Sequence, residues 1–225
     1  MLVLVVDSST PAVTAALVEV SADGVVPRAH RCTVDARAHG ELLAPQVDAV
    51  LADAGARPRD LAAIVAGLGP GPFTGLRVGL VTAATMGQVL GVPTYGVCSL
   101  DAIGYPAALG EPVLAASNAR RREVYWAIYD GAGQRIAGPN VDAPAVAAQR
   151  ARDLAVTAAV GDGAHRYADV LGLPLRVEPR YPDATALATL AAERIRAGAP
   201  TEALTPLYLR RPDAVAATAR KSVLP

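Results

Sequence analysis

The order of its strand-like and helix-like segments constrains the fold of this 225-residue chain most strongly. Three apolar runs come first, at Leu2–Val6, Ala12–Val20 and Arg28–Val34, and the turn residues Ala22-Asp23-Gly24 separate the second from the third. Runs of this length, rich in valine and leucine and bounded by turn residues, predict strands. The chain is therefore expected to open with an antiparallel meander.

Helices and strands then alternate. We expect a helix at Glu41–Ala54, a strand at Leu61–Leu68, a long helix at Thr74–Leu90, a strand at Thr94–Val97 and a short helix at Ser99–Leu109. Apolar residues recur at helical spacing in the predicted helices, and Gly55 and Gly91 follow the first two. Pro45 predicts an irregular or kinked first turn. This order places the chain in the α/β class.

The second half restarts with strands. We expect strands at Val113–Ser117, Glu123–Tyr129, Arg135–Gly138 and Val156–Val160, and helices at Ala143–Asp153, Ala164–Leu171 and Thr185–Ala197. The two halves share a rough order of strands followed by α/β units, although no sequence repeat is visible. We therefore predict two lobes, residues 1–109 and 110–212, and a mobile tail at 213–225.

Composition limits the function classes. Hydrophobic residues make up 52% and charged residues 19% of the chain, which allows a proper core. No apolar run is long enough to span a bilayer, the N-terminus reads as a strand, and the two cysteines lack metal-ligand spacing. A cytoplasmic protein is expected. Because the formal net charge is zero, the chain alone is not expected to bind nucleic acid tightly.

Two segments could carry chemistry. Asp7-Ser8-Ser9-Thr10, at the end of the first strand, offers a carboxylate and hydroxyls for a metal-bound water or phosphate, but spacing alone favours a polar turn that caps the strand. The loop Gly69-Pro70-Gly71-Pro72 precedes a helix, where backbone N–H groups can bind anions. Its two prolines lack N–H donors and no P-loop lysine follows, so docking or packing suits it better.

The long predicted helix carries small residues at every fourth position, Gly79, Ala83 and Gly87. Such a stripe lets another helix approach closely, either within the chain or from a second chain. We predict a partner interface on this helix and the preceding one, formed by Leu43, Val47, Leu51, Leu76, Gly79, Leu80, Ala83 and Gly87. On this hypothesis Gly79→Leu or Gly87→Leu weakens the partner complex more than it unfolds the chain.

Other signals are weak or absent. The three histidines, His30, His39 and His165, form no metal-binding pair, and no nucleophile elbow occurs. His39 lies where a helix begins, which indicates capping. Arg120-Arg121-Arg122 is typical of a solvated basic patch, with a tRNA or nucleotide contact as the less favoured interpretation. No catalytic or metal-ligating residue is therefore assigned.

Several of these motifs together resemble a known family. The segments 7–10, 39–45 and 69–77 resemble the bacterial tRNA threonylcarbamoyladenosine biosynthesis proteins TsaB, and 93–102, 123–125, 161–164 and 206–210 extend the resemblance over nearly the whole chain. Gly69–Arg77 is the most specific element. The chain departs from the family at Pro72, where serine is usual, and at Asn118, where aspartate is frequent.

The resemblance implies an actin/hexokinase-like (ASKHA) fold of two related lobes, each a mixed sheet flanked by helices. It implies a non-catalytic subunit that binds and activates the catalytic paralogue TsaD, together with the ATPase subunit TsaE. A homodimer is implied for the isolated chain, and tRNA contact only through the complex. No cofactor is implied for the chain alone, and ATP is placed, if anywhere, at the interface of the complex.

The resemblance also implies a vestigial nucleotide cleft at Asp7, Ser8, Ser9, Gly69, Gly71, Thr74, Gly75 and Arg77. The paralogue's His-x-x-x-His metal pair aligns with Ser99 and Ile103, and isoleucine cannot coordinate a metal. Two alternatives stay open at this point. One is a sugar- or metabolite-kinase-like enzyme with Asp7 serving the metal, and the other is a metallopeptidase, for which the sequence offers no metal site.

Overall fold

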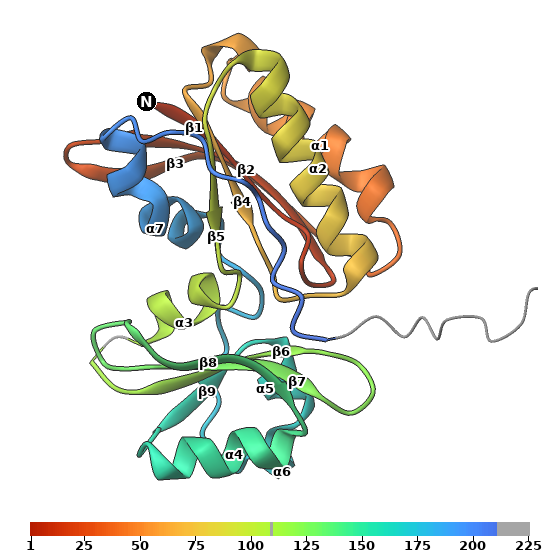
Figure 1. The fold of residues 1–225 in the computed structure, drawn as a ribbon, viewed down its shortest axis with the longest axis vertical. Helices are drawn as coiled ribbons and strands as arrows, with labels where there is room; N and C mark the ends of the chain where they lie inside the picture. The colour runs from red at the N-terminus through yellow and green to blue at the C-terminus, as the bar shows by residue number, and fades with distance from the viewer. Residues whose placement is uncertain (109, 211–225) are drawn as a thin grey trace, which may run out of the picture.

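Two mixed β-sheets, each covered by helices, make up this computed structural model, which describes residues 1–108 and 110–210 (Figure 1). The strands are β1 Leu2–Asp7, β2 Ala12–Ser21, β3 Gly24–Val34, β4 Ala63–Gly67, β5 Thr94–Val97, β6 Val113–Asn118, β7 Val124–Tyr129, β8 Arg135–Asp142 and β9 Ala158–Val160. The α-helices are α1 His39–Asp53, α2 Phe73–Leu90, α3 Asp101–Ala107, α4 Pro144–Asp153, α5 Asp162–Arg166, α6 Ala168–Leu171 and α7 Ala184–Arg196, and Pro58–Asp60 is a 3₁₀ turn.

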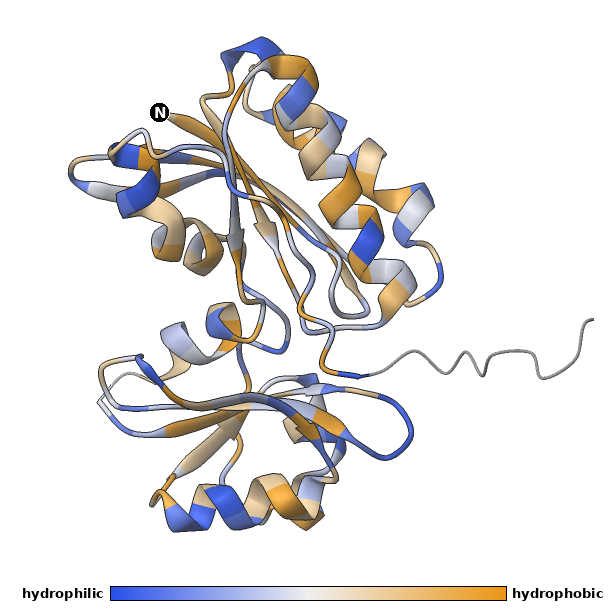
Figure 2. Ribbon diagram, viewed as in Figure 1, coloured by the Kyte–Doolittle hydropathy of each residue, from blue (hydrophilic) through white to orange (hydrophobic). Residues whose placement is uncertain are grey.

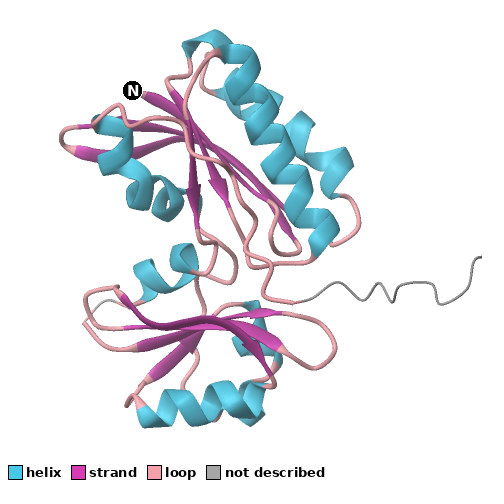
Figure 3. Cartoon of the chain, in the orientation of Figure 1, coloured by secondary structure: helices cyan, strands magenta, loops and turns pink. Residues whose placement is uncertain are grey.

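The first sheet has the strand order β3-β2-β1-β4-β5. The pairs β3–β2 and β2–β1 are antiparallel, whereas β1–β4 and β4–β5 are parallel. Side chains alternate along β1, so Leu4 and Val6 pack beneath α1 and α2 while Val3 and Val5 pack beneath α7. Helices therefore cover both faces (Figure 3), which explains why β1 is an unbroken apolar run.

The second sheet repeats the pattern of the first. Its order is β8-β7-β6-β9, with the first two pairs antiparallel and β6–β9 parallel. A helix connects the third and fourth strands in both lobes, α1 in the first and α4 in the second. In Figure 2 the strands of both sheets are mostly in hydrophobic colours, and the hydrophilic segments gather in loops and on outer helices. The α/β class and the two related lobes are confirmed.

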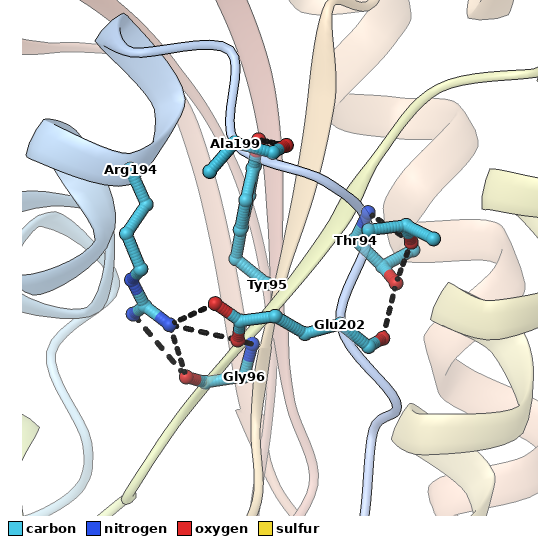
Figure 4. Close-up of polar contacts among 7 residues, drawn as sticks. Thr94, Tyr95, Gly96, Arg194, Ala199 and Glu202 are labelled. Atoms are coloured by element: carbon cyan, nitrogen blue, oxygen red, sulfur yellow. Dashed lines mark hydrogen bonds and ion pairs between the residues drawn. The ribbon is translucent and has the colours of Figure 1, made fainter.

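The chain returns to the first lobe after the second. The buried side chains of α7, among them Leu187 and Ile195, pack on the first sheet. Tyr95 Oη donates to the Ala199 carbonyl oxygen at 2.7 Å, and Arg194 Nη1 donates to both Glu202 carboxylate oxygens at 2.7 Å (Figure 4). The expected bounds of the second lobe, 110–212, therefore differ from the observed packing, because α7 lies within this range but packs on the first sheet.

A few elements differ from the sequence predictions. The segment expected as one helix at Ala164–Leu171 is two short helices, separated at Tyr167 with φ −120°. β3 and β8 are longer than expected, and α1 includes Pro45 without a break in the helix. The tail predicted at 213–225 lies outside the described residues. Within the described part of the chain, no helix is both long and apolar enough to cross a membrane.

Candidate functional site

The polar segment at the end of β1 is buried and its groups bond to one another. Asp7, Ser8, Ser9 and Thr10 are each at most 3% exposed. Ser9 donates from its backbone N at 2.9 Å and from Oγ at 2.8 Å to Asp7 Oδ1, and Ser99 Oγ donates to Asp7 Oδ2 at 2.6 Å. The Asp7 carboxyl therefore has both oxygens occupied by the chain itself, which leaves it poorly placed to bind a metal or phosphate.

Burial raises the pKa of Asp7 above its usual value, and hydrogen bonds from Ser99 and Ser9 act in the opposite direction. The effect of desolvation therefore outweighs that of the hydrogen bonds. His39 lies nearby, and its Nε2 donates to the Thr10 carbonyl oxygen at 2.8 Å. The predicted capping role of His39 is wrong, because the N-cap is Ala38 and no side chain caps α1.

The glycine–proline loop packs directly on this segment. A Cβ at Gly71 would lie 2.0 Å from the Ser9 carbonyl oxygen, and one at Gly75 would lie 3.0 Å from that of Ser8. The backbone N of Gly69 donates to Ser99 Oγ at 3.1 Å. The loop and the strand end are therefore in direct contact and leave little open space between them. Of the eight predicted cleft residues, only Thr74 and Arg77 are exposed.

The predicted partner interface needs a correction. All eight residues are buried, and the six with larger side chains belong to the core beneath α1 and α2. A Cβ at Gly79 would lie 2.5 Å from Ser8 Oγ, and one at Gly87 would lie 2.4 Å from Thr94 Cγ2. The small-residue stripe thus packs on the chain's own first lobe.

An open cleft of about 720 Å³ lies between the lobes. Its described lining comes from three places: the start of α2, the turn between β6 and β7, and the C-terminal segment; the residues are Gly71, Pro72, Phe73, Arg77, Ala119, Arg120, Arg121, Tyr125, Tyr208, Leu209 and Arg210. Sequence reasoning identified Arg77 and the loop but missed the C-terminal residues. Their positions depend on the return of the chain after α7, which no local pattern indicates.

The comparisons with known proteins decide the family. The sequence model of TsaD, described as tRNA N6-adenosine threonylcarbamoyltransferase, matches residues 13–218. The chain belongs to the TsaD family.

Within the TsaD family, this chain is TsaB-like. It is 36% identical over 132 residues to the tRNA threonylcarbamoyladenosine biosynthesis protein TsaB of Escherichia coli, which covers 57% of this chain and 55% of that protein. The crystal structure of YeaZ from Pseudomonas aeruginosa superimposes with a TM-score of 0.73 at 26% identity, over 92% of this chain and all of that one. An uncharacterized protein of Mycobacterium tuberculosis (strain H37Rv) is 49% identical over 94% of this chain and 93% of its own length.

Ser99 and Ile103 can now be compared with the corresponding residues of the catalytic paralogue. The sequence analysis matched them to the two metal-binding histidines that the resemblance implies for the catalytic paralogue. Ser99 bonds to Asp7, and Ile103 is fully buried in the core that faces the second sheet. Among the described residues, no group of three or more His, Cys, Asp or Glu could hold a metal ion. These two positions are thus occupied by structural side chains.

Proposed function

We propose that this chain is a non-catalytic, cytoplasmic subunit that binds and activates the catalytic paralogue TsaD in the synthesis of threonylcarbamoyladenosine on tRNA. One observation carries the proposal: Ser99 and Ser9 satisfy the Asp7 carboxyl at the end of β1. In open α/β sheets, ligands generally bind outside the carboxyl ends of the strands. A strand end closed in this way favours a structural role over the kinase-like alternative.

The outer face of α2 supports a protein partner. Val81 is 61% exposed and Val89 is 77% exposed. Val81 and Val89 are eight residues apart and therefore lie on the same side of the helix. Apolar side chains grouped on one exposed face favour a protein contact. We place the contact with TsaD on this outer face of α2, together with the neighbouring face of α1.

A variant with a matched control tests the contact. Val81→Glu puts a charge on the proposed interface without touching the core, and it should weaken binding to the catalytic paralogue at least about tenfold. Val177→Glu is the control, because Val177 is 73% exposed and lies in the second lobe. Affinities are measured by titration of the purified partners, and the folding of both variants by circular dichroism. Equal affinity of both variants would place the interface elsewhere.

The activating role needs a functional assay. The paralogue is assayed for tRNA modification with and without this chain, with the ATPase subunit TsaE present in both arms. We expect modification to depend on this chain and to fall with Val81→Glu. Modification that proceeds equally well without the chain would overturn the proposal, as would phosphoryl transfer by the chain alone. Gel filtration of the isolated chain tests the expected homodimer.

A further inference from the structure

After α7 the chain crosses from the first lobe to the second, and we call residues 199–210 the strap (Figure 1). Two other segments connect the lobes: one contains α3 and joins β5 to β6, and the other joins α6 to α7. In the view of Figure 1, α3 lies on the left of the boundary between the lobes, and the strap reaches this boundary further to the right. A third connection at a distance from α3 limits how the lobes can rotate about the other two.

The first part of the strap is attached to the first lobe. Glu202 N donates to the Thr94 carbonyl oxygen at 2.8 Å. The Glu202 carboxylate accepts from Gly96 N at 3.1 Å and from Arg194 Nη1 at 2.7 Å (Figure 4). Leu204 then packs against the core beneath α1 and α2. Backbone, charged and apolar contacts therefore all hold this end of the strap in place.

Further along the strap, successive side chains contact different lobes. Leu207 and Leu209 pack against the core cluster between α3 and the second sheet. Tyr208, between them, accepts a hydrogen bond from Arg77 Nε of α2 at 2.9 Å, and its ring stacks on Phe73 with centroids 5.2 Å apart. The strap therefore touches both lobes at their boundary.

Arg210 attaches the strap to the turn between β6 and β7. Its Nη1 donates to the Ala119 carbonyl oxygen at 3.0 Å, and its guanidinium forms an ion pair with Glu123. Ala119 N donates to the Glu123 carbonyl oxygen at 3.0 Å, which closes the turn. The three arginines inside it, at 120–122, have φ values of 59°, 50° and 62°, in the left-handed region that favours glycine. Strained backbone of this kind is often part of a mechanism, and here it holds both acceptors toward Arg210.

The contact at Arg210 is the weaker end of the strap. The side chains of Arg210 and Glu123 are 25% and 37% exposed. Ion pairs that are partly exposed contribute little to stability, and salt weakens them. The other end has backbone hydrogen bonds at Thr94 and Gly96 in addition to its charged groups. If the lobes separate, the contact at Arg210 should therefore break first.

We propose that the strap is a latch that holds the two lobes at one angle, with Arg210 as its releasable contact. When this contact breaks, the lobes rotate about the two other connections and a second, more open arrangement becomes populated. The inference does not rest on the proposed partnership with TsaD, because the chain alone can be tested.

The test is a measurement of the distance between the lobes by pulsed electron paramagnetic resonance on the purified chain. One nitroxide label is attached to Cys32, which is exposed on β3 of the first lobe. The other is attached at Val146→Cys, because Val146 is 51% exposed on α4 of the second lobe. Cys98 stays unlabelled, because it is buried and burial raises the pKa of its thiol to about 12.

We expect one narrow distribution of distances for the labelled chain. Arg210→Met removes the charge and the donors but keeps the apolar stem, and it should raise the ratio of open to closed molecules about tenfold. Glu123→Gln and about 1 M NaCl should act in the same direction. Arg176→Met is the matched control, because Arg176 is 28% exposed and pairs with Glu111 inside the second lobe. It should leave the distribution unchanged.

Circular dichroism verifies that each variant is folded. The latch is refuted if Arg210→Met and Glu123→Gln both give the distribution of the unmodified chain, or if Arg176→Met changes it equally. It is also refuted if the unmodified chain already populates several distances at low salt. A salt effect as large in Arg210→Met as in the unmodified chain would count against it too, because the screened charges would then lie elsewhere.

Discussion

Ser99 is the residue on which the closed end of β1 depends. Because burial raises the pKa of Asp7, this carboxyl favours folding below its ordinary pKa near 4, and that contribution is lost as the pH rises through the raised value. Ser99→Ala removes a bond to the charged form and raises the pKa further. We expect the variant to lose about 2 kcal/mol at pH 7 and less at pH 4, as measured by urea unfolding.

Ser21→Ala is the matched control, because among the described residues its hydroxyl accepts a single exposed hydrogen bond, from Asp23 N at 3.2 Å. It should change the free energy of unfolding by less than about 0.5 kcal/mol at both pH values. A loss for Ser99→Ala that is the same at pH 4 and pH 7 would mean that Asp7 does not ionise in this range.

Sequence reasoning at this scale found the Asp7 cluster but left its role open. Spacing alone could not distinguish a binding site from a polar turn, because the deciding partner, Ser99, is 92 residues away. The cleft between the lobes was harder to predict from the sequence than the Asp7 cluster. Arg77, the glycine–proline loop and the arginines at 120–122 were visible as local signals, but Arg77 and Tyr208 meet across 131 residues.

At the scale of elements, α2 is fixed to the first sheet by its glycines. Gly79 N donates to Ser8 Oγ at 2.8 Å, and the space for a side chain is taken by the same oxygen. Gly79→Ala should therefore destabilise the chain by about 2 kcal/mol through overpacking, although alanine has the higher helix propensity. Gly40→Ala in α1 is the control, because nothing lies within 4 Å of its added Cβ, and it should be neutral or slightly stabilising.

Thermal and urea unfolding of the two variants distinguish the cases. Equal stability would show that the contact with Ser8 relaxes easily, and it would reopen the stripe of small residues as a surface for a second chain.

Elements with strong local signals were predicted well. α2 was expected from Thr74 and begins at Phe73, and its end at Leu90 follows from Gly91, which has φ 67° at the C-cap. β5 has the predicted bounds. The stripe of small residues showed that something packs closely on α2, but not which surface. That choice depends on the sheet and cannot be read from helical spacing.

At the scale of the whole molecule, the two sheets share the order of their first four strands although their sequences show no repeat. Strand order depends on where turns and helices fall along the chain, and many residues satisfy the same alternation of buried and exposed positions. The return of α7 to the first sheet was not predicted. An amphipathic helix shows that it has a buried face without showing which sheet covers it.

This return joins the lobes and should make them unfold together. Glu202 bonds to Arg194 and accepts from Gly96 N at 3.1 Å, which attaches the C-terminal segment to the first lobe. That segment continues to Arg210, which bonds to the second lobe. Glu202→Ala should therefore cost about 1–2 kcal/mol, while the exposed neighbour Glu193→Ala changes stability little.

The single tryptophan, Trp126, is buried in the second sheet and reports on that lobe alone. If the lobes form one cooperative unit, Glu202→Ala lowers the urea midpoint of Trp126 fluorescence as much as that of circular dichroism, which follows both lobes. A fluorescence midpoint that stays at the unmodified value, with an earlier phase in circular dichroism, would show that the first lobe unfolds separately. The segments of chain that connect the two lobes would then not couple their unfolding.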